Sequence, residues 1–289
     1  MKTYLDCLPC FLSQALKVAR MTTKNEKIHR KILDRVMGEL SQSPLEASPP
    51  EISQKIYSLI KMITKNGDPY RKAKKEQNEL ALGLYSPFKK LISKSKDPLL
   101  LSLRLAIAGN IIDLGVRNKI NDIKEEILTT LNSPLKINDY RIFQHSLENA
   151  NMILYLGDNA GEIVFDKILI EEIKRIREVK IIFAVRGSPI INDVTMEDAN
   201  LVRMGEVAEV ISNGFDAPAT ILSQSSPEIS RLFSKADMII AKGQGNYESL
   251  SSEKKNIFFL LKAKCSVVAR DLGVGEGDTI LKSQIDAIN

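Results

Sequence analysis

Acidic and amide side chains follow apolar segments in the second half of the chain. Asp158 and Asn159 come directly after the apolar run 152–156, and Asp193 follows the run 180–185 by several residues. Carboxylate and amide oxygens are the ligands that Mg²⁺ and Mn²⁺ prefer in proteins. Each of these residues could instead cap the helix that follows it. We therefore predict a divalent-cation site at Asp158, Asn159 and Asp193, with helix capping as the alternative.

Positive charge and glycine stand at the ends of similar segments. Arg186 directly follows the run 180–185, and Lys242-Gly243-Gln244-Gly245-Asn246 follows the run 238–241. A guanidinium can hold a phosphate with two hydrogen bonds, and glycines let backbone N–H groups approach an anion. An ion pair of Arg186 and a tight turn without a ligand are the simpler alternatives. The glycine segment matches neither a Walker loop nor GxGxxG, because Glu248 stands where the third glycine would be.

Together these groups suit a reaction at a phosphate. A cation held by two carboxylates and an amide can bind an anionic oxygen, while lysine and arginine neutralise the remaining charge. Phosphoryl transfer needs this combination. The spacing leaves hydrolysis, transfer and simple binding open.

The elements that must position these residues change in type along the chain. Apolar residues at three- and four-residue spacing predict helices over 9–20, 25–41, 51–64, 69–94, 97–115 and 120–131, with no strand before about residue 150. Thereafter the runs 152–156, 180–185, 210–211 and 238–241 predict strands. They alternate with helices over 161–178, 195–203 and 227–236 and a helical turn over 246–253, and 258–263 and 266–269 are further apolar runs.

This alternation predicts an α/β fold with a doubly wound, mainly parallel sheet over residues 136–289, preceded by a helical N-terminal region over 1–135. In open parallel sheets, ligands bind beyond the carboxyl ends of the strands. The candidate residues follow the predicted strands, so we expect them to meet at that edge.

Composition argues against several classes of function. The net charge is +5, with basic residues scattered among acidic ones, and there is no Trp, so we expect no nucleic-acid partner. No apolar run is long enough to cross a bilayer, and Asp6 and Gln14 interrupt the N-terminal apolar stretch of a signal peptide. Three cysteines are too few for a disulfide framework. We expect a cytoplasmic protein without a membrane partner, and its oligomeric state is open.

The motif Cys7-Leu8-Pro9-Cys10 stands at the start of the first predicted helix. A structural zinc site needs about four ligands, and the chain offers no second CxxC, although Cys265 could be a third thiolate. A redox pair is also compatible, because a helix start lowers the pKa of a thiol. A pair of small core-facing residues is the simpler alternative, so the role of Cys7 and Cys10 stays open.

Six short motifs resemble those of the damage-control phosphatases, formerly the domain-of-unknown-function family eighty-nine. No single motif is decisive, but six in the same order over nearly the whole chain are specific, and the CxxC resembles that of the compact prokaryotic and archaeal subfamily. In chain order they are Cys7-Leu8-Pro9-Cys10 with Gln14, Asp68-Pro69-Tyr70 with Lys74 and Asn78, Gly109-Asn110-Ile111-Ile112-Asp113, Gly157-Asp158-Asn159-Ala160-Gly161-Glu162, Pro189 through Asn192-Asp193, and Lys242-Gly243-Gln244-Gly245-Asn246-Tyr247-Glu248.

The resemblance implies a metal-dependent phosphatase that removes phosphate from small metabolites, sugar phosphates among them, with Mg, Mn, Co or Ni as the ion. It implies metal ligation by Asp158, Asn159 and Asp193, and a substrate phosphate held by Lys242 and its glycine turn. It also places Asn110 and Asp113 near the site. Our candidate catalytic residues are Asp158 and Lys242, and the nucleophile is either a metal-activated water or a carboxylate, with Asp158 first among the carboxylates. Our candidate substrate-binding residues are Arg186, Lys242, Gly243, Gly245, Asn246 and Asn110.

Three other functions stay open. An S-adenosylmethionine-dependent carboxyl methyltransferase, an activity proposed for a eukaryotic relative, would want an acid after the second strand, where this chain has Arg186. A non-catalytic protein that binds phosphorylated metabolites would keep Lys242 and Gly243. A redox or metal-handling protein would depend on Cys7 and Cys10.

Overall fold

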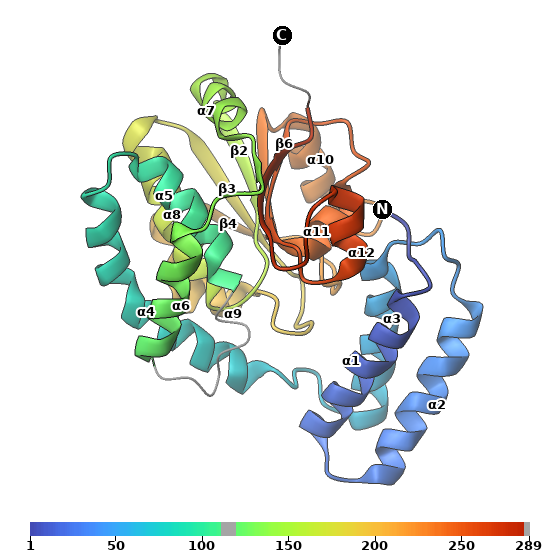
Figure 1. Cartoon of the computed structure of the whole chain (residues 1–289). Coiled ribbons are helices and arrows are strands. Elements are labelled where there is room, and N and C mark those ends of the chain that lie inside the picture. Colours follow the sequence, from blue (N-terminus) through green and yellow to red (C-terminus); the bar gives the residue numbers. More distant parts are fainter. Residues whose placement is uncertain (111–119, 286–289) are drawn as a thin grey trace.

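A twisted, mainly parallel sheet forms the centre of the molecule in the computed structural model, which describes residues 1–110 and 120–285 (Figure 1). Within these residues the sheet has seven strands in the order β1-β7-β6-β5-β2-β3-β4. Neighbouring strands run parallel except for β6 and β7. The predicted α/β class is thus confirmed. The strands are β1 (Ile137–Asn138), β2 (Met152–Leu156), β3 (Lys180–Val185), β4 (Glu209–Ser212), β5 (Met238–Lys242), β6 (Ile257–Lys262) and β7 (Thr279–Ser283).

Helices cover both faces of the sheet. Successive residues of a strand point to opposite faces: in β2, Ile153 and Tyr155 belong to one apolar core, whereas Leu154 and Leu156 belong to the other. The second core is covered by α10 (Pro227–Lys235), α11 (Gly243–Leu250) and α12 (Ser266–Leu272). The first core is covered by α4 (Arg71–Ser93), α5 (Pro98–Ala108), α6 (Ile120–Asn132), α7 (Tyr140–Asn149), α8 (Glu162–Ile176) and α9 (Met196–Leu201). A short 3₁₀ helix, Met204–Glu206, follows α9.

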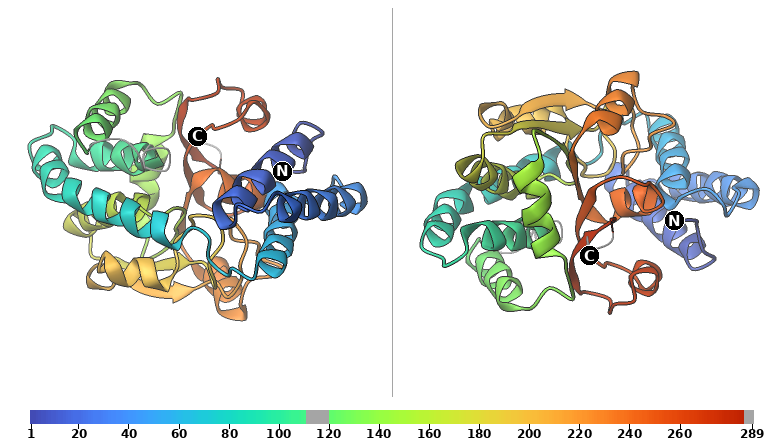
Figure 2. Two further views of the ribbon diagram at one scale, coloured as in Figure 1. Left: turned by 90° about the horizontal axis from the view of Figure 1, so that it is seen from below. Right: turned by 90° about the horizontal axis from the view of Figure 1, so that it is seen from above.

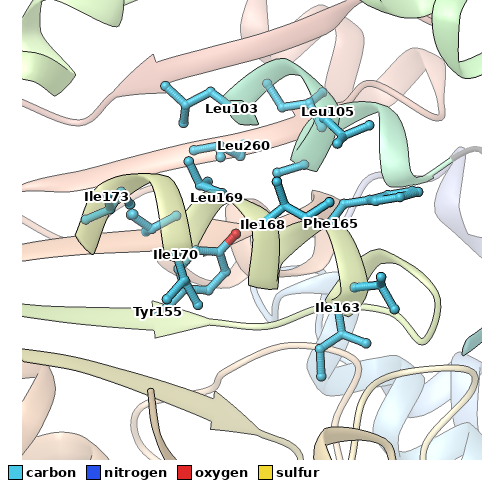
Figure 3. Packing of buried hydrophobic residues seen from close by; sticks show 14 of the residues in the cluster. Leu103, Leu105, Tyr155, Ile163, Phe165, Ile168, Leu169, Ile170, Ile173 and Leu260 are labelled. Atoms are coloured by element: carbon cyan, nitrogen blue, oxygen red, sulfur yellow. The ribbon is translucent and has the colours of Figure 1, made fainter. Parts of the chain in front are cut away.

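Helix α8 is the most deeply buried of these helices at its N-terminal end. Every side chain from Glu162 to Ile170 is buried, and Figure 3 shows its apolar residues packed with Leu103 and Leu105 of α5 and with Tyr155 of β2. A helix that is buried all round must pair its charged residues inside the protein. Glu162 and Asp166 therefore need buried partners.

The N-terminal helices divide into two groups. Helices α1 (Cys7–Thr22), α2 (Glu26–Gln42) and α3 (Pro49–Thr64) enclose a small apolar core of their own and stand to one side of the sheet (Figures 1 and 2). We predicted one helical region over 1–135. In the structure, α4 to α6 pack on the sheet's own core instead, because Leu84 and Phe88 of α4 contact that apolar cluster.

Most predicted helices and strands occur within a few residues of the expected positions. The strand β1, the helix α7 and the antiparallel strand β7 were not predicted. The expectation of no strand before about residue 150 was wrong, because β1 has only two residues and so shows no pattern. The apolar run 266–269 is helical, and α11 begins at Gly243 rather than Asn246. Asp113 lies outside the described residues. Among the described helices, none has the length and apolar character needed to cross a membrane.

The direction of winding reverses between β2 and β5. From β2 the chain continues through β3 to β4 on one side, and then returns to β5 and β6 on the other. Leu156 at the end of β2 pairs with Ala241 near the end of β5. Such a switch point leaves a crevice beyond the strand ends. Asp158 and Gly243 follow these two ends, so they are placed beside that crevice.

Candidate functional site

A cleft of about 430 Å³ opens at this edge of the sheet, between the strand ends and the helices α1 and α3. Asp158, Asn159 and Asp193 line it from the sheet side. Gln14 of α1 and Tyr57 of α3 line it from the helical side. The three predicted metal ligands therefore share one solvent-accessible space.

Backbone hydrogen bonds bring together the two segments that carry the predicted metal ligands. The amide of Val194 donates to the carbonyl of Asp158 (2.8 Å), and the amide of Ala160 donates to the carbonyl of Asn192 (2.9 Å). These bonds place Asn159 opposite Asp193 as an isolated bridge. Strand β3 adds its own pairing with β2, so the relative position of the two segments is set by main chain on both sides.

Neither acid serves as a helix cap, which was the alternative role. The N-cap of α8 is Gly161, and the N-cap of α9 is Thr195. Thr195 forms a capping box with Asp198, so it supplies the hydrogen bonds that Asp193 could have supplied. Asp158 and Asp193 are thus buried at a cleft without the ordinary structural reason for an acid at such a position.

The side chains fit a hard divalent cation. The Asn159 Nδ2 donates to Asp158 Oδ2 (2.8 Å) and to Glu162 Oε1 (3.0 Å), so its Oδ1 is the end that can bind a cation. The Arg186 Nε donates to Asp193 Oδ1 at 2.7 Å. Two carboxylates and one amide oxygen suit Mg²⁺ or Mn²⁺, which keep water or substrate oxygens as further ligands. No group of three or more His, Cys, Asp or Glu residues forms a ready metal cage within the described ranges.

The charges around Asp158 favour an added cation. Burial raises the pKa of Asp158 well above its usual value, and the nearby carboxylates of Glu162 and Asp193 raise it further. Arg186 and Lys264 act in the opposite direction without reversing the shift. An ionised Asp158 is therefore costly in the protein alone, and a divalent cation would stabilise it.

Lys242 lies beneath the site rather than in the cleft. Its side chain is fully buried, and its ammonium is 2.8 Å from Asp166 Oδ1 and 3.0 Å from Glu162 Oε2. Glu162 in turn accepts the hydrogen bond from Asn159. We predicted that Lys242 contacts the substrate phosphate. The structure instead pairs its charge with two carboxylates of α8, because these buried acids need a cation.

Arg186, Asn246 and Asn110 are also engaged by the protein itself. Arg186 is 1% exposed and directed at Asp193 and Asp158. The Asn246 amide accepts from the backbone of Thr220 (2.8 Å) and donates to the carbonyl of Lys242 (2.8 Å). Asn110 donates to Glu162 Oε1 at 2.6 Å, which also accepts from Asn159. None of the three is among the residues that line the cleft, which differs from the predicted substrate contact.

Close approach explains the two glycines after β5. A Cβ on Gly243 would lie 2.0 Å from Asp158 Oδ2, and the φ of Gly243 is +79°. A Cβ on Gly245 would lie 2.1 Å from the carbonyl oxygen of Pro218. Gly243 therefore leaves room for the Asp158 carboxylate, and Gly245, which lines the cleft, leaves room for the main chain of Pro218.

Glu162 stands in one of the six motifs but was not among our candidate site residues. It is 1% exposed and joins Asn110, Asn159 and Lys242 through its two carboxylate oxygens. Its signal is present in the sequence: Glu162 and Asp166 stand one turn apart in an otherwise apolar helix start. Two acids on the buried side of a helix require a partner, and that requirement could have identified them.

The motif residues of α4 hold the same segments from the other side. Lys74 is buried and donates to Asp198 Oδ2 at 3.1 Å, and Asn78 donates to Asp198 Oδ1 at 2.9 Å. The side-chain oxygen Oδ1 of Asn78 accepts from the backbone amide of Gly161 at 2.7 Å. Helix α4 thus fixes the starts of α8 and α9, which closely follow the segments that carry the predicted metal ligands.

The cations that line the cleft are different ones. Of the described lysines and arginines, Lys17 of α1 and Lys264, just before α12, belong to the cleft lining, and both are exposed. Lys264 also lowers the pKa of Asp158 by its charge. Helix α11 begins at the same cleft with Gln244 and Gly245, and a helix N-terminus favours an anion.

Comparison with known proteins supports one family for this arrangement. The model of the damage-control phosphatase ARMT1-like domain matches residues 3–280. The chain belongs to the damage-control phosphatase family. The damage-control phosphatase PH1575 of Pyrococcus horikoshii is 37% identical over 279 residues, which cover 96% of each chain. A protein of Archaeoglobus fulgidus named damage-control phosphatase is 35% identical, covering 96% of this chain and 97% of that protein.

The fold comparison agrees. A crystal structure of a protein from Pyrococcus horikoshii, titled a duf89 family protein, superposes with a TM-score of 0.93 at 35% identity and covers 99% of this chain and 100% of that one. The similarity therefore includes both the sheet and the helices α1 to α3. The resemblance inferred from six motifs is confirmed.

Proposed function

We propose that this damage-control phosphatase hydrolyses small phosphorylated metabolites, sugar phosphates among them, with a divalent cation held by Asp158, Asn159 and Asp193. The observation that carries the proposal is the meeting of two buried carboxylates and an amide oxygen at one open cleft. The names of the relatives support phosphatase chemistry. When bound, a divalent cation polarises a phosphate oxygen and lowers the pKa of a bound water.

The protein's own groups divide into two layers in this proposal. Lys264, with the start of α11, neutralises the substrate phosphate in the cleft, since its charge already reaches Asp158. We reassign Lys242 and Arg186 to the layer below. Lys242 holds Glu162, which orients Asn159, and Arg186 orients Asp193. Fixed orientation of charged groups is what electrostatic catalysis requires.

The size of the cleft limits the substrate. About 430 Å³ is the volume of a site for a small molecule. The helical side offers the amide of Gln14 and the hydroxyls of Ser53 and Tyr57, which can bind hydroxyl groups of a sugar. We therefore propose a phosphorylated polyhydroxy compound rather than a phosphorylated protein or a nucleic acid.

The test is the release of inorganic phosphate from para-nitrophenyl phosphate and a panel of sugar phosphates. The protein is assayed with Mg²⁺, Mn²⁺, Co²⁺, Ni²⁺ or chelator, as wild type and as Asp158→Ala. Metal-dependent release that Asp158→Ala abolishes supports the proposal. No release from folded protein with any of these metals contradicts it, and tight binding of a sugar phosphate without release would point to a binding protein.

A second pair of variants tests the phosphate contact. Lys264→Ala should raise KM for each phosphorylated substrate by about 10- to 100-fold, the size of a charge-assisted hydrogen bond. Lys262→Ala is the matched control, because Lys262 is two residues away and does not line the cleft. Equal KM values for the two variants would exclude Lys264 as the phosphate ligand.

A further inference from the structure

All three cysteines of the chain line the cleft that holds Asp158. Cys7 and Cys10 lie in the first turn of α1, and Cys265 is the N-cap residue of α12. Figure 1 shows the start of α1 near α12, although the two are far apart in the sequence. The proposed metal chemistry uses none of these thiols.

The three thiols differ in exposure and in hydrogen bonding. Cys10 is exposed, whereas Cys7 and Cys265 are half-buried. The Gln14 Nε2 donates to Cys10 Sγ at 3.2 Å, and the Gln244 Nε2 donates to Cys265 Sγ at 3.4 Å. A donor directed at sulfur stabilises the thiolate, which is the reactive form. Cys10 combines such a donor with access to solvent.

We expect the Cys7 thiol to react with a solute more slowly than the Cys10 thiol. Burial raises the pKa of Cys7. A hydrogen bond with the backbone at Tyr4 opposes this shift, and the charges of Glu248, Cys265 and Cys10 add to it. This shift disfavours the thiolate of Cys7, which is the reactive form. Because Cys7 and Cys10 are separated by one helical turn, Cys7 stands ready to attack an oxidised Cys10.

We propose that Cys7 and Cys10 form a reversible disulfide at the rim of the cleft and that this oxidation inhibits the phosphatase, an inference that rests on the proposed function. A peroxide is the oxidant. The Cys10 thiolate attacks one peroxide oxygen, the O–O bond breaks, and a sulfenic acid and hydroxide form. The Cys7 sulfur then attacks Cys10 Sγ, the S–O bond breaks, and water leaves with the Cys7 proton. Two thiols lose two electrons, and the peroxide gains them. A dithiol reductant reverses the change.

The effect on activity follows from the hydrogen bonds of Cys10. The Tyr57 hydroxyl donates to Gln14 Oε1 at 3.4 Å, and Gln14 donates to Cys10. These three side chains line the wall of the cleft that α1 and α3 form. A disulfide moves Cys10 Sγ toward Cys7, so Gln14 loses its acceptor and the wall facing the substrate rearranges.

The experiment uses the full chain, reduced and loaded with the metal that supports phosphate release. It is treated with hydrogen peroxide and then with a dithiol. Peptide masses should show that Cys7 and Cys10 together lose two hydrogen atoms while Cys265 stays a thiol. The kcat/KM for para-nitrophenyl phosphate should fall by about 10- to 100-fold, as expected for a misplaced substrate. The dithiol should restore it.

Three variants separate the possible causes. Cys10→Ser keeps an acceptor for Gln14, and both it and Cys7→Ser should resist reversible inhibition. Cys265→Ser should respond as the wild type does. A disulfide that includes Cys265, a Cys7–Cys10 disulfide with unchanged kcat/KM, or equal inhibition of Cys10→Ser would overturn the proposal.

The thiol readout is independent of catalysis. If the reduced protein releases no phosphate with any metal, the proposed function and the inhibition both fail. The peptide masses then still decide whether Cys7 and Cys10 form a disulfide.

Discussion

Replacement of Gly243 by alanine tests whether the close approach of this residue positions Asp158. The new Cβ would lie 2.0 Å from Asp158 Oδ2 and 2.3 Å from Asp158 Cγ, whereas real Cβ contacts under 3.0 Å are essentially never seen. The carboxylate must therefore move away by about 1 Å, and a displacement of that size at a reacting group can lower the rate by about 100-fold.

Alanine also adds a backbone penalty at this position. The φ of Gly243 is +79°, and a left-handed conformation costs a residue with a Cβ about 1–2 kcal/mol. For a domain of this size the penalty corresponds to a decrease in Tm of roughly 2–8 °C. A loss of activity therefore needs a control that has the same backbone penalty without the clash.

Gly273→Ala is that control. Gly273 has a φ of +69°, and a Cβ built there meets nothing within 4 Å. We expect both variants to show a lower Tm in a thermal melt. Only Gly243→Ala should lower kcat/KM for para-nitrophenyl phosphate by about 100-fold and weaken Mn²⁺ binding by calorimetry. If Gly243→Ala keeps the kcat/KM and the metal affinity of Gly273→Ala, our account of how Asp158 is positioned is refuted.

Three further changes test the charges around the site. Lys242→Met leaves Glu162 and Asp166 without their buried cation and should lower the free energy of unfolding in urea by about 3–5 kcal/mol. A triple variant that adds Glu162→Gln and Asp166→Asn should recover most of this loss. No recovery would contradict the pairing. Burial raises the pKa of Asp158, so Asp158→Asn should melt above the wild type in chelator at neutral pH but gain nothing from Mn²⁺; a lower Tm in chelator would contradict this. Burial also raises the pKa of Glu248 from 4.5 to about 7. The ionisation of Glu248 therefore destabilises the fold progressively as pH rises between these values. Glu248→Gln should be more stable than the wild type at about pH 8 and equal to it at about pH 4, as equilibrium melts at the two pH values would show.

Much of the architecture could be predicted from local sequence patterns. The 3.6-residue spacing of apolar residues located nearly all of the long helices. Short apolar runs located the central strands, because the sheet is buried on both faces and its strands are continuous apolar runs. The candidate metal ligands could be placed at one edge of the sheet for a related reason. Asp158 and Asp193 follow such runs, and parallel strands end at one edge of a sheet, so their side chains had to be near one another.

The direction of the basic side chains could not be predicted in this way. Lys242 and Arg186 also stand at strand ends, and the same rule placed them in the cleft with the acids. Their partners decide otherwise: Glu162 lies 80 residues from Lys242 in the sequence, and no local pattern pairs them. A buried charged side chain is stable only where an opposite charge lies beside it.

By itself, then, the sequence of this damage-control phosphatase determined the alternation of strands and helices, the edge where the chemistry lies and the acidic residues at that edge, because these depend on period and order along the chain. Only the tertiary structure decided which charges face the cleft. It placed Lys242 and Arg186 beneath the candidate ligands and Lys264 in the cleft, and it brought Cys7, Cys10 and Cys265 to the same cleft. These outcomes depend on the pairing of distant residues in a space with little water, where an unpaired charge is too costly to keep.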